Sequence, residues 1–144
     1  MTITSENLDS AADLCSNAAD AALTKLIELG ARPADANAAA TWDAQDSLLK
    51  NKISTLNNLS SSISAQIVSN ALDQQWPNLN TLSAVTASAQ VDIQKIADIN
   101  QAMATLASII NFGVSVITMA TQPSVANSES LATSFKNMAG ILQN

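Results

Sequence analysis

The sequence contains no histidine and no tyrosine, and Cys15 is its single cysteine in 144 residues. One cysteine cannot form an intrachain disulfide, and without histidine the usual ligands of a transition-metal site are missing. There is also no catalytic triad, glycine-rich phosphate loop or paired-cysteine motif. We therefore expect no enzyme activity, no cofactor and no metal site. We interpret Cys15 as a small buried hydrophobic residue, and the acidic pairs Asp9/Asp13 and Asp43/Asp46 as solvated helix faces.

Charge is scarce as well. Six basic and twelve acidic residues give a net charge of −6, whereas serine, threonine, asparagine and glutamine total 52. Six scattered basic residues form no patch that could displace counterions from phosphates, which speaks against a nucleic-acid partner and against anionic lipid headgroups. A largely neutral surface resists association less than a charged one, so we expect a homo-oligomer or a helical protein partner.

The first residues, 1–6, include neither a basic segment nor an apolar one. They do not form a classical signal peptide, and we expect a cytoplasmic protein or one secreted by a leaderless route.

Glycine and proline occur only three times each, so few turns are available and the helices must be long. Alanine occurs 26 times, and aromatic residues make up 3% of the chain, which favours close helix–helix packing. Turn signals lie at Gly30, Pro33, Trp76-Pro77-Asn78 and Pro123. They predict one all-α domain over residues 1–144, with helices at about 6–29, 34–75, 79–121 and 125–142. Asn57 to Ser62 are poor helix formers, so the second helix either runs through them, which we favour, or breaks there.

The second and third predicted helices have matching lengths on either side of Pro77, which predicts a long antiparallel hairpin. In that hairpin residues 102–120 face residues 34–52. Chain connectivity then places the first and fourth helices at the end that holds both termini. The expected shape is a helical bundle of four helices, coiled-coil-like in its spacing, at that end and a thin two-helix arm toward Trp76.

Asp73 is the single charged residue in the range 53–91. A neutral two-helix arm exposes apolar surface along its seam, and such seams usually bind a partner. Our leading hypothesis is therefore a non-catalytic interaction protein that self-associates or binds a protein partner through residues 53–91. For the tryptophan itself we favour a side chain that folds over the turn and caps the hairpin, with partner contact as the alternative. The candidate contact residues are Ile63, Ile67, Trp76, Leu82 and Ala89.

Residues 99–128 form a thirty-residue run without any charge. Its central part, 102–120, has about the length of a membrane span, which allows an alternative hypothesis of a membrane-active, pore-forming component. A hydroxyl- and amide-bearing stripe, Thr105, Ser108, Asn111, Ser115 and Thr118, could line a pore. We favour the other interpretation, a central bundle helix covered by its neighbours. The candidate insertion residues are Leu106, Ile110, Val114 and Ile117.

A helical hairpin with tryptophan at its turn resembles the small secreted proteins of the WXG type. Here the turn is Trp76-Pro77-Asn78, which lacks the glycine of that motif, and the tail lacks the tyrosine of its export signal. Long helices with an uncharged segment are also similar to components of α-helical pore-forming toxins. Both are similarities of architecture, which do not transfer function.

Overall fold

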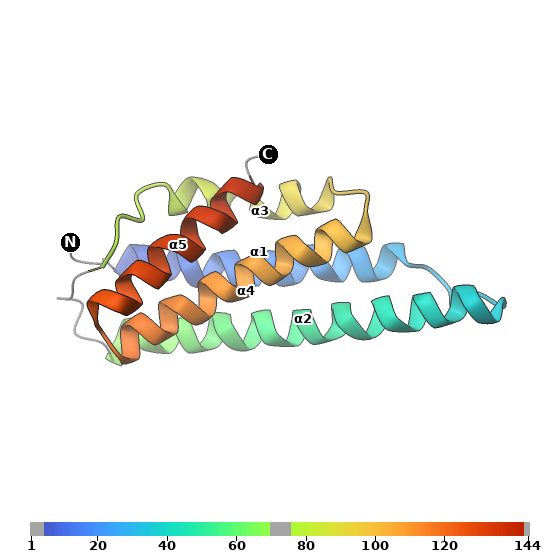
Figure 1. Cartoon of the computed structure of the whole chain (residues 1–144), viewed down its shortest axis with the longest axis horizontal. Coiled ribbons are helices and arrows are strands. Elements are labelled where there is room, and N and C mark those ends of the chain that lie inside the picture. The colour runs from blue at the N-terminus through green and yellow to red at the C-terminus, as the bar shows by residue number, and fades with distance from the viewer. Residues whose placement is uncertain (1–4, 70–75, 143–144) are drawn as a thin grey trace.

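Five α-helices form the protein in the computed structural model, which describes residues 5–69 and 76–142 (Figure 1). The predicted all-α helical bundle is confirmed, and the described residues contain no strand. The second helix runs without a break through residues 57–62, as we favoured, and its predicted end at residue 75 lies outside the described residues. The helices are α1 (Ser5–Glu28), α2 (Ala36–Ser69), α3 (Leu82–Gln94), α4 (Ile99–Thr121) and α5 (Val125–Leu142).

Helix α1 is the central element, because it contacts α2, α3 and α4. Its small side chains allow the neighbouring backbones to approach closely, and three polar side chains bond across these contacts. Ser60 on α2 donates to the carbonyl oxygen of Ala12 at 2.9 Å. Thr86 on α3 donates to Ser10 at 3.0 Å, and Asn17 donates back to the carbonyl oxygen of Thr86 at 3.3 Å. The buried residues of α1 are Leu8, Ala11, Ala12, Leu14, Cys15, Ala18, Ala19, Ala21, Ala22 and Lys25.

The helix ends follow local sequence signals. Gly30, two residues after the end of α1, adopts a φ of +68°, the left-handed conformation that glycine tolerates best. The Asp35 carboxylate accepts a bond from the Ala38 amide at 2.9 Å at the start of α2. The Ser124 hydroxyl accepts one from Asn127 at 3.0 Å at the start of α5. These caps satisfy amides that the first turn of a helix leaves without an intrahelical partner.

The continuous helix predicted for residues 79–121 is wrong, because the chain turns at residues 95–98 and forms α3 and α4 instead. At the end of α3, hydrogen bonds from Lys25 of α1 stabilise this interruption of the helix. Its ammonium donates to the carbonyl oxygen of Gln94 at 3.0 Å and to that of Ile96. At the start of α4, the Asp98 carboxylate accepts a bond from the Asn100 amide at 2.9 Å. Polar backbone groups at the end of α3 and at the start of α4 thus have hydrogen-bond partners, although the helix is interrupted between them.

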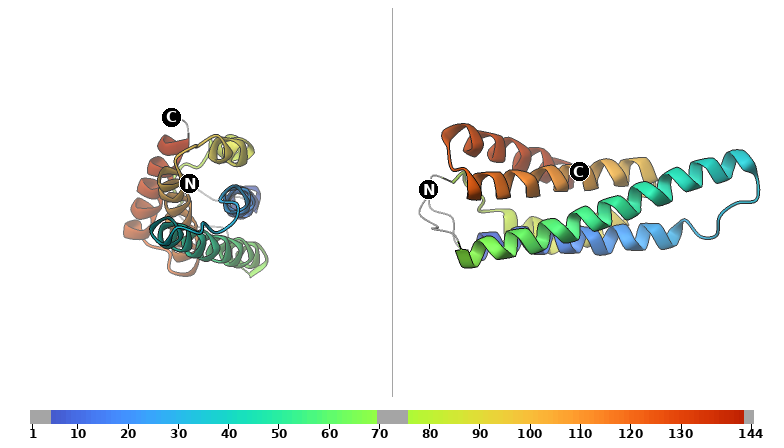
Figure 2. Two further views of the ribbon diagram at one scale, coloured as in Figure 1. Left: turned by 90° about the vertical axis from the view of Figure 1, so that its right-hand side faces the viewer. Right: turned by 90° about the horizontal axis from the view of Figure 1, so that it is seen from below.

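This turn reverses the chain, so α4 runs in the same direction as α2 (Figure 1). The predicted antiparallel pairing of residues 102–120 with residues 34–52 is therefore wrong. A Cβ atom on Gly113 of α4 would lie 3.1 Å from a methyl carbon of Leu59, far along α2. The predicted thin arm at Trp76 is also wrong: α1 lies along α2 and α3, and the start of α3 lies at the same end of the bundle as the N-terminus. The projecting part is the α1–α2 connection and the start of α2 (Figures 1 and 2).

At the contact of α1, α2 and α4, Gly113 packs against Cys15 and Leu59. The Cβ of a larger residue there would lie 3.1 Å from the Cys15 sulfur and 3.1 Å from Leu59 Cδ1, whereas Gly140 on α5 has no such neighbour within 4 Å. We expect Gly113→Leu to lower the free energy of unfolding by about 1–3 kcal/mol, because it overfills a tight contact. Gly140→Leu should raise it by about 0.5–1 kcal/mol, because leucine is the better helix former. Urea unfolding followed by circular dichroism measures both. Equal effects of the two substitutions would contradict the close contact.

Cys15 is fully buried, which confirms its interpretation as a core residue, and burial raises the pKa of its thiol from 9.0 to about 12. The unfolded chain releases this proton above about pH 9, whereas the folded protein retains it up to about pH 12. Folding therefore loses stability as the pH rises through this window. We expect the free energy of unfolding to fall by about 1 kcal/mol more in the wild type than in Cys15→Ala between about pH 8 and about pH 10. Urea titrations at both pH values measure this, and parallel profiles would disprove it.

Candidate functional site

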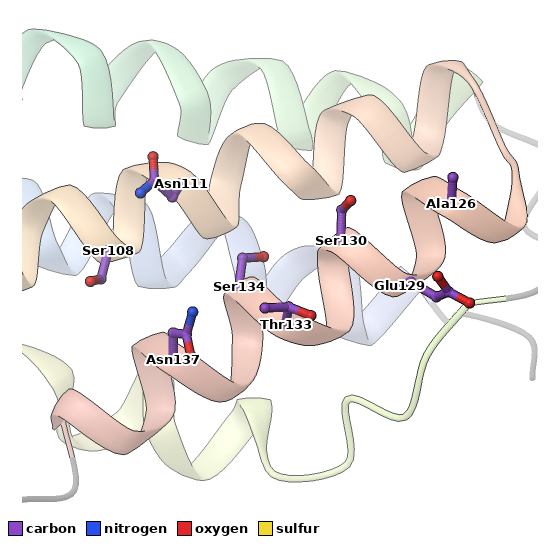
Figure 3. A pocket seen from close by; sticks show the side chains of 8 residues that line it. All are labelled: Ser108, Asn111, Ala126, Glu129, Ser130, Thr133, Ser134 and Asn137. Atoms are coloured by element: carbon purple, nitrogen blue, oxygen red, sulfur yellow. The ribbon is translucent and has the colours of Figure 1, made fainter.

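A groove of about 560 Å³ lies between α4 and α5. Ser108 and Asn111 line it from α4, and the other lining residues belong to α5 (Figure 3). Those residues are Ala126, Glu129, Ser130, Thr133, Ser134 and Asn137.

The chemistry of this groove is hydroxyl and amide, with Glu129 as the one ionisable side chain in its lining. Proton transfer needs an acid and a base with a positioned substrate, and a single exposed carboxylate does not supply that pair. The Ser134 hydroxyl is already bonded to the carbonyl oxygen of Leu131 at 3.0 Å. The lining also has no aromatic ring for stacking and no basic side chain for an anion. Within the described residues, no group of three acidic or cysteine side chains could hold a metal ion.

Helix α4 presents a second surface, made of three of the residues proposed for membrane insertion. Val114 is 48% exposed, and Ile110 and Ile117 are half-buried. Spacings of four and three residues place these side chains along one side of the helix. We call Ile110, Val114 and Ile117 the α4 ridge. The fourth predicted residue, Leu106, is fully buried in the core and is not part of it.

Among the described helices, α4 alone is long and apolar enough to cross a membrane, and half of its most apolar stretch is buried inside the bundle. The predicted polar stripe on this helix is largely satisfied within the helix itself. Thr105, Ser115 and Thr118 each donate to the carbonyl oxygen four residues earlier, at 3.0, 2.9 and 2.9 Å. Such bonds let hydroxyl groups lie on an apolar helix without other partners.

Four of the five residues proposed for partner binding on the arm lie inside the bundle. Ile63, Leu82 and Ala89 are fully buried, Trp76 is 3% exposed, and the side chain of Ile67 lies outside the described residues. The expectation of an exposed seam is wrong because α1 covers this part of α2 and α3 along its length. Trp76 is thus buried rather than presented to a partner, which agrees with the inward-folded side chain that we favour, although the predicted hairpin itself does not form. Among the described residues, its indole nitrogen has no hydrogen-bond partner.

Two residues that determine the fold at α3 and α4 were not predicted, Lys25 and Asp98. Asp98 has a sequence signal, since Gln101 follows it three residues later, as in a capping box. Lys25 has none, because its partners are backbone carbonyls about seventy residues away along the chain.

We compared the chain with models of protein families, with curated proteins and with solved structures, and found no match in any of the three.

Proposed function

We propose that the protein is a non-catalytic helical interaction protein that forms a homodimer through the α4 ridge. One observation carries the proposal: Ile110, Val114 and Ile117 remain partly exposed within a run of thirty residues that holds no charge. The proposal keeps self-association from the sequence analysis and moves its surface from residues 53–91 to α4.

Two of the other exposed apolar side chains lie next to an acidic residue in the sequence, unlike the α4 ridge. Ile27 is 71% exposed but is followed by Glu28, and Val91 is 51% exposed but is followed by Asp92. In a two-fold dimer each residue near the axis meets its own copy, so an acidic residue there meets a like charge. The α4 ridge has no charged neighbour in the sequence, where the nearest charged residues are Asp98 and Glu129.

The size of the ridge determines how strong the association is. A standard interface buries about 800 Å² on each partner. Helix α4 has 23 residues and is therefore about 34 Å long, of which only one side is free. Three apolar side chains on this side support a dimer that forms at micromolar concentrations and dissociates on dilution.

We expect Val114→Asp to weaken dimerisation at least about tenfold, because it places two carboxylates close together across the two-fold axis. Val91→Asp is the matched control, since it introduces the same charge at a valine of similar exposure on α3. Light scattering coupled to size-exclusion chromatography should give the wild type and the control a mass approaching twice 14.9 kDa at high concentration. A wild-type protein that stays monomeric at millimolar concentration would refute the proposal.

The length and composition of α4 favour a second candidate function, a membrane-active component that inserts this helix. Insertion requires α5 to leave α4, because Phe112 and Phe135 pack together with ring centroids 5.6 Å apart. A membrane-active protein should release dye from liposomes. Val114→Asp should reduce the release, because an acidic residue near the bilayer centre costs about 3 kcal/mol, and Val91→Asp should not. If wild-type protein releases no dye from neutral or anionic liposomes, this candidate is excluded.

A further inference from the structure

The turn at residues 95–98 interrupts a sequence that is itself suited to a continuous helix. Neither glycine nor proline occurs between Pro77 and Gly113. Apolar residues continue across the turn at helical spacing, through Ile93, Ile96 and Ile99. The bend therefore depends on contacts with other parts of the molecule rather than on a local helix breaker.

Those contacts compete directly with the bonds of a straight helix. In an uninterrupted helix the Asn100 amide would donate to the carbonyl oxygen of Ile96. In the bent chain the Asn100 amide donates to the Asp98 carboxylate instead, at 2.9 Å. The Ile96 carbonyl oxygen accepts a hydrogen bond from the Lys25 ammonium. Lys25 is only 3% exposed, and in a straight helix it would keep Glu28, at 3.2 Å, as its remaining partner. A buried ammonium that loses partners is costly, so Lys25 opposes straightening.

The bend also borders an open groove at the surface. A cavity of about 410 Å³ lies against it, lined by Lys95, Ile96 and Ala97 of the turn, Asp92 and Gln101 beside it, and the last residues of α5. The backbone of the turn therefore has space on this side to change its conformation.

We propose that residues 95–98 are a hinge through which two copies of the chain exchange their α4–α5 hairpins. In the exchanged dimer α3 and α4 join into one continuous helix, and the hairpin of each copy packs against α1 and α2 of the other. The Gly113 contact with Leu59 and Cys15 is then remade between copies, whereas the Phe112–Phe135 contact stays within the hairpin. Only the hinge changes its local contacts, the condition under which exchange of identical elements is favourable. This inference does not depend on the α4 ridge, which would associate closed monomers side by side.

Two substitutions shift the hinge in opposite directions. Lys25→Met removes the ammonium that binds the bent turn. It should raise the dimer-to-monomer ratio about tenfold, because the loss of one hydrogen bond to a charged group changes an equilibrium constant by about this factor. Ile99→Pro fits the bent chain, because residue 99 is the first of α4 and Asp98 is already extended with a ψ of 117°. Proline cannot continue the straight helix, so this variant should form no exchanged dimer. Ile99→Ala removes side-chain atoms without restricting the backbone and should behave like the wild type.

The experiment refolds each protein from urea at high concentration and separates the species that survive dilution by size-exclusion chromatography. An exchanged dimer must open before it can dissociate and so persists, whereas a dimer held by the α4 ridge dissociates. Adding Val114→Asp to Lys25→Met should leave the persistent dimer unchanged, which separates this inference from the proposed function. If Lys25→Met forms no persistent dimer, or if Ile99→Pro forms as much as Lys25→Met, the hinge is refuted.

A distance measurement tests the straight helix itself. The protein for this experiment carries Cys15→Ala and Lys25→Met, and spin labels are attached at Ser83→Cys and Thr121→Cys. Double electron–electron resonance then measures the distance between the two labels, which mark the two ends of the joined helix. Mixing with excess unlabelled protein before refolding restricts the signal to one chain. The joined helix separates the labelled positions by about 57 Å, whereas the start of α3 and the end of α4 lie at the same end of the closed bundle (Figure 1). A persistent dimer without the long distance would overturn the proposal.

Discussion

The ammonium of Lys25 is the contact on which the arrangement of the other helices depends. It lies in the corner between α3 and α4. The carbonyl oxygens of Gln94, at the end of α3, and of Ile96, in the turn, accept its hydrogen bonds, and Glu28 supplies the opposite charge. Because the chain reverses there, α4 lies parallel to α2, and α5 returns over α4 to the hinge. Without that corner, α3 and α4 would be one long helix, and α1 would lack one of its three neighbours.

Helix α1 explains why so few large side chains suffice for this core. Its buried residues are mostly alanine, so three neighbouring helices can approach it closely. The polar bonds from Ser60, Thr86 and Asn17 then satisfy groups at these contacts that would otherwise be buried without partners. Gly113 lets α4 approach α1 and α2 closely in the same way, because a Cβ atom at this position would lie too near Cys15 and Leu59.

The sequence was sufficient for the local features, because caps and turns act over a few residues. Gly30, the continuous α2 and the start of α5 near Ser124 could all be predicted from nearby residues. The corner at residues 95–98 could not, because its main stabilising contact comes from α1. Helical spacing is the same on both sides of the corner, so periodicity alone cannot show a reversal of direction. From that one error followed the wrong pairing for α4 and the wrong position for the exposed arm, and Ile63, Trp76, Leu82 and Ala89 were assigned to a surface although they are core.

The uncharged run in α4 has a physical explanation that needs no membrane. A helix in contact with α1, α2 and α5 is apolar on most of its circumference, since a charge on any of those sides would be buried. Leu106, Ile109, Phe112 and Val116 are completely buried and illustrate this. Packing within the chain does not account for Val114, which is 48% exposed and lies between two half-buried isoleucines. The interior of the bundle thus explains why most of α4 is apolar, including Ile110 and Ile117, which pack against the core, whereas Val114 lies at the surface.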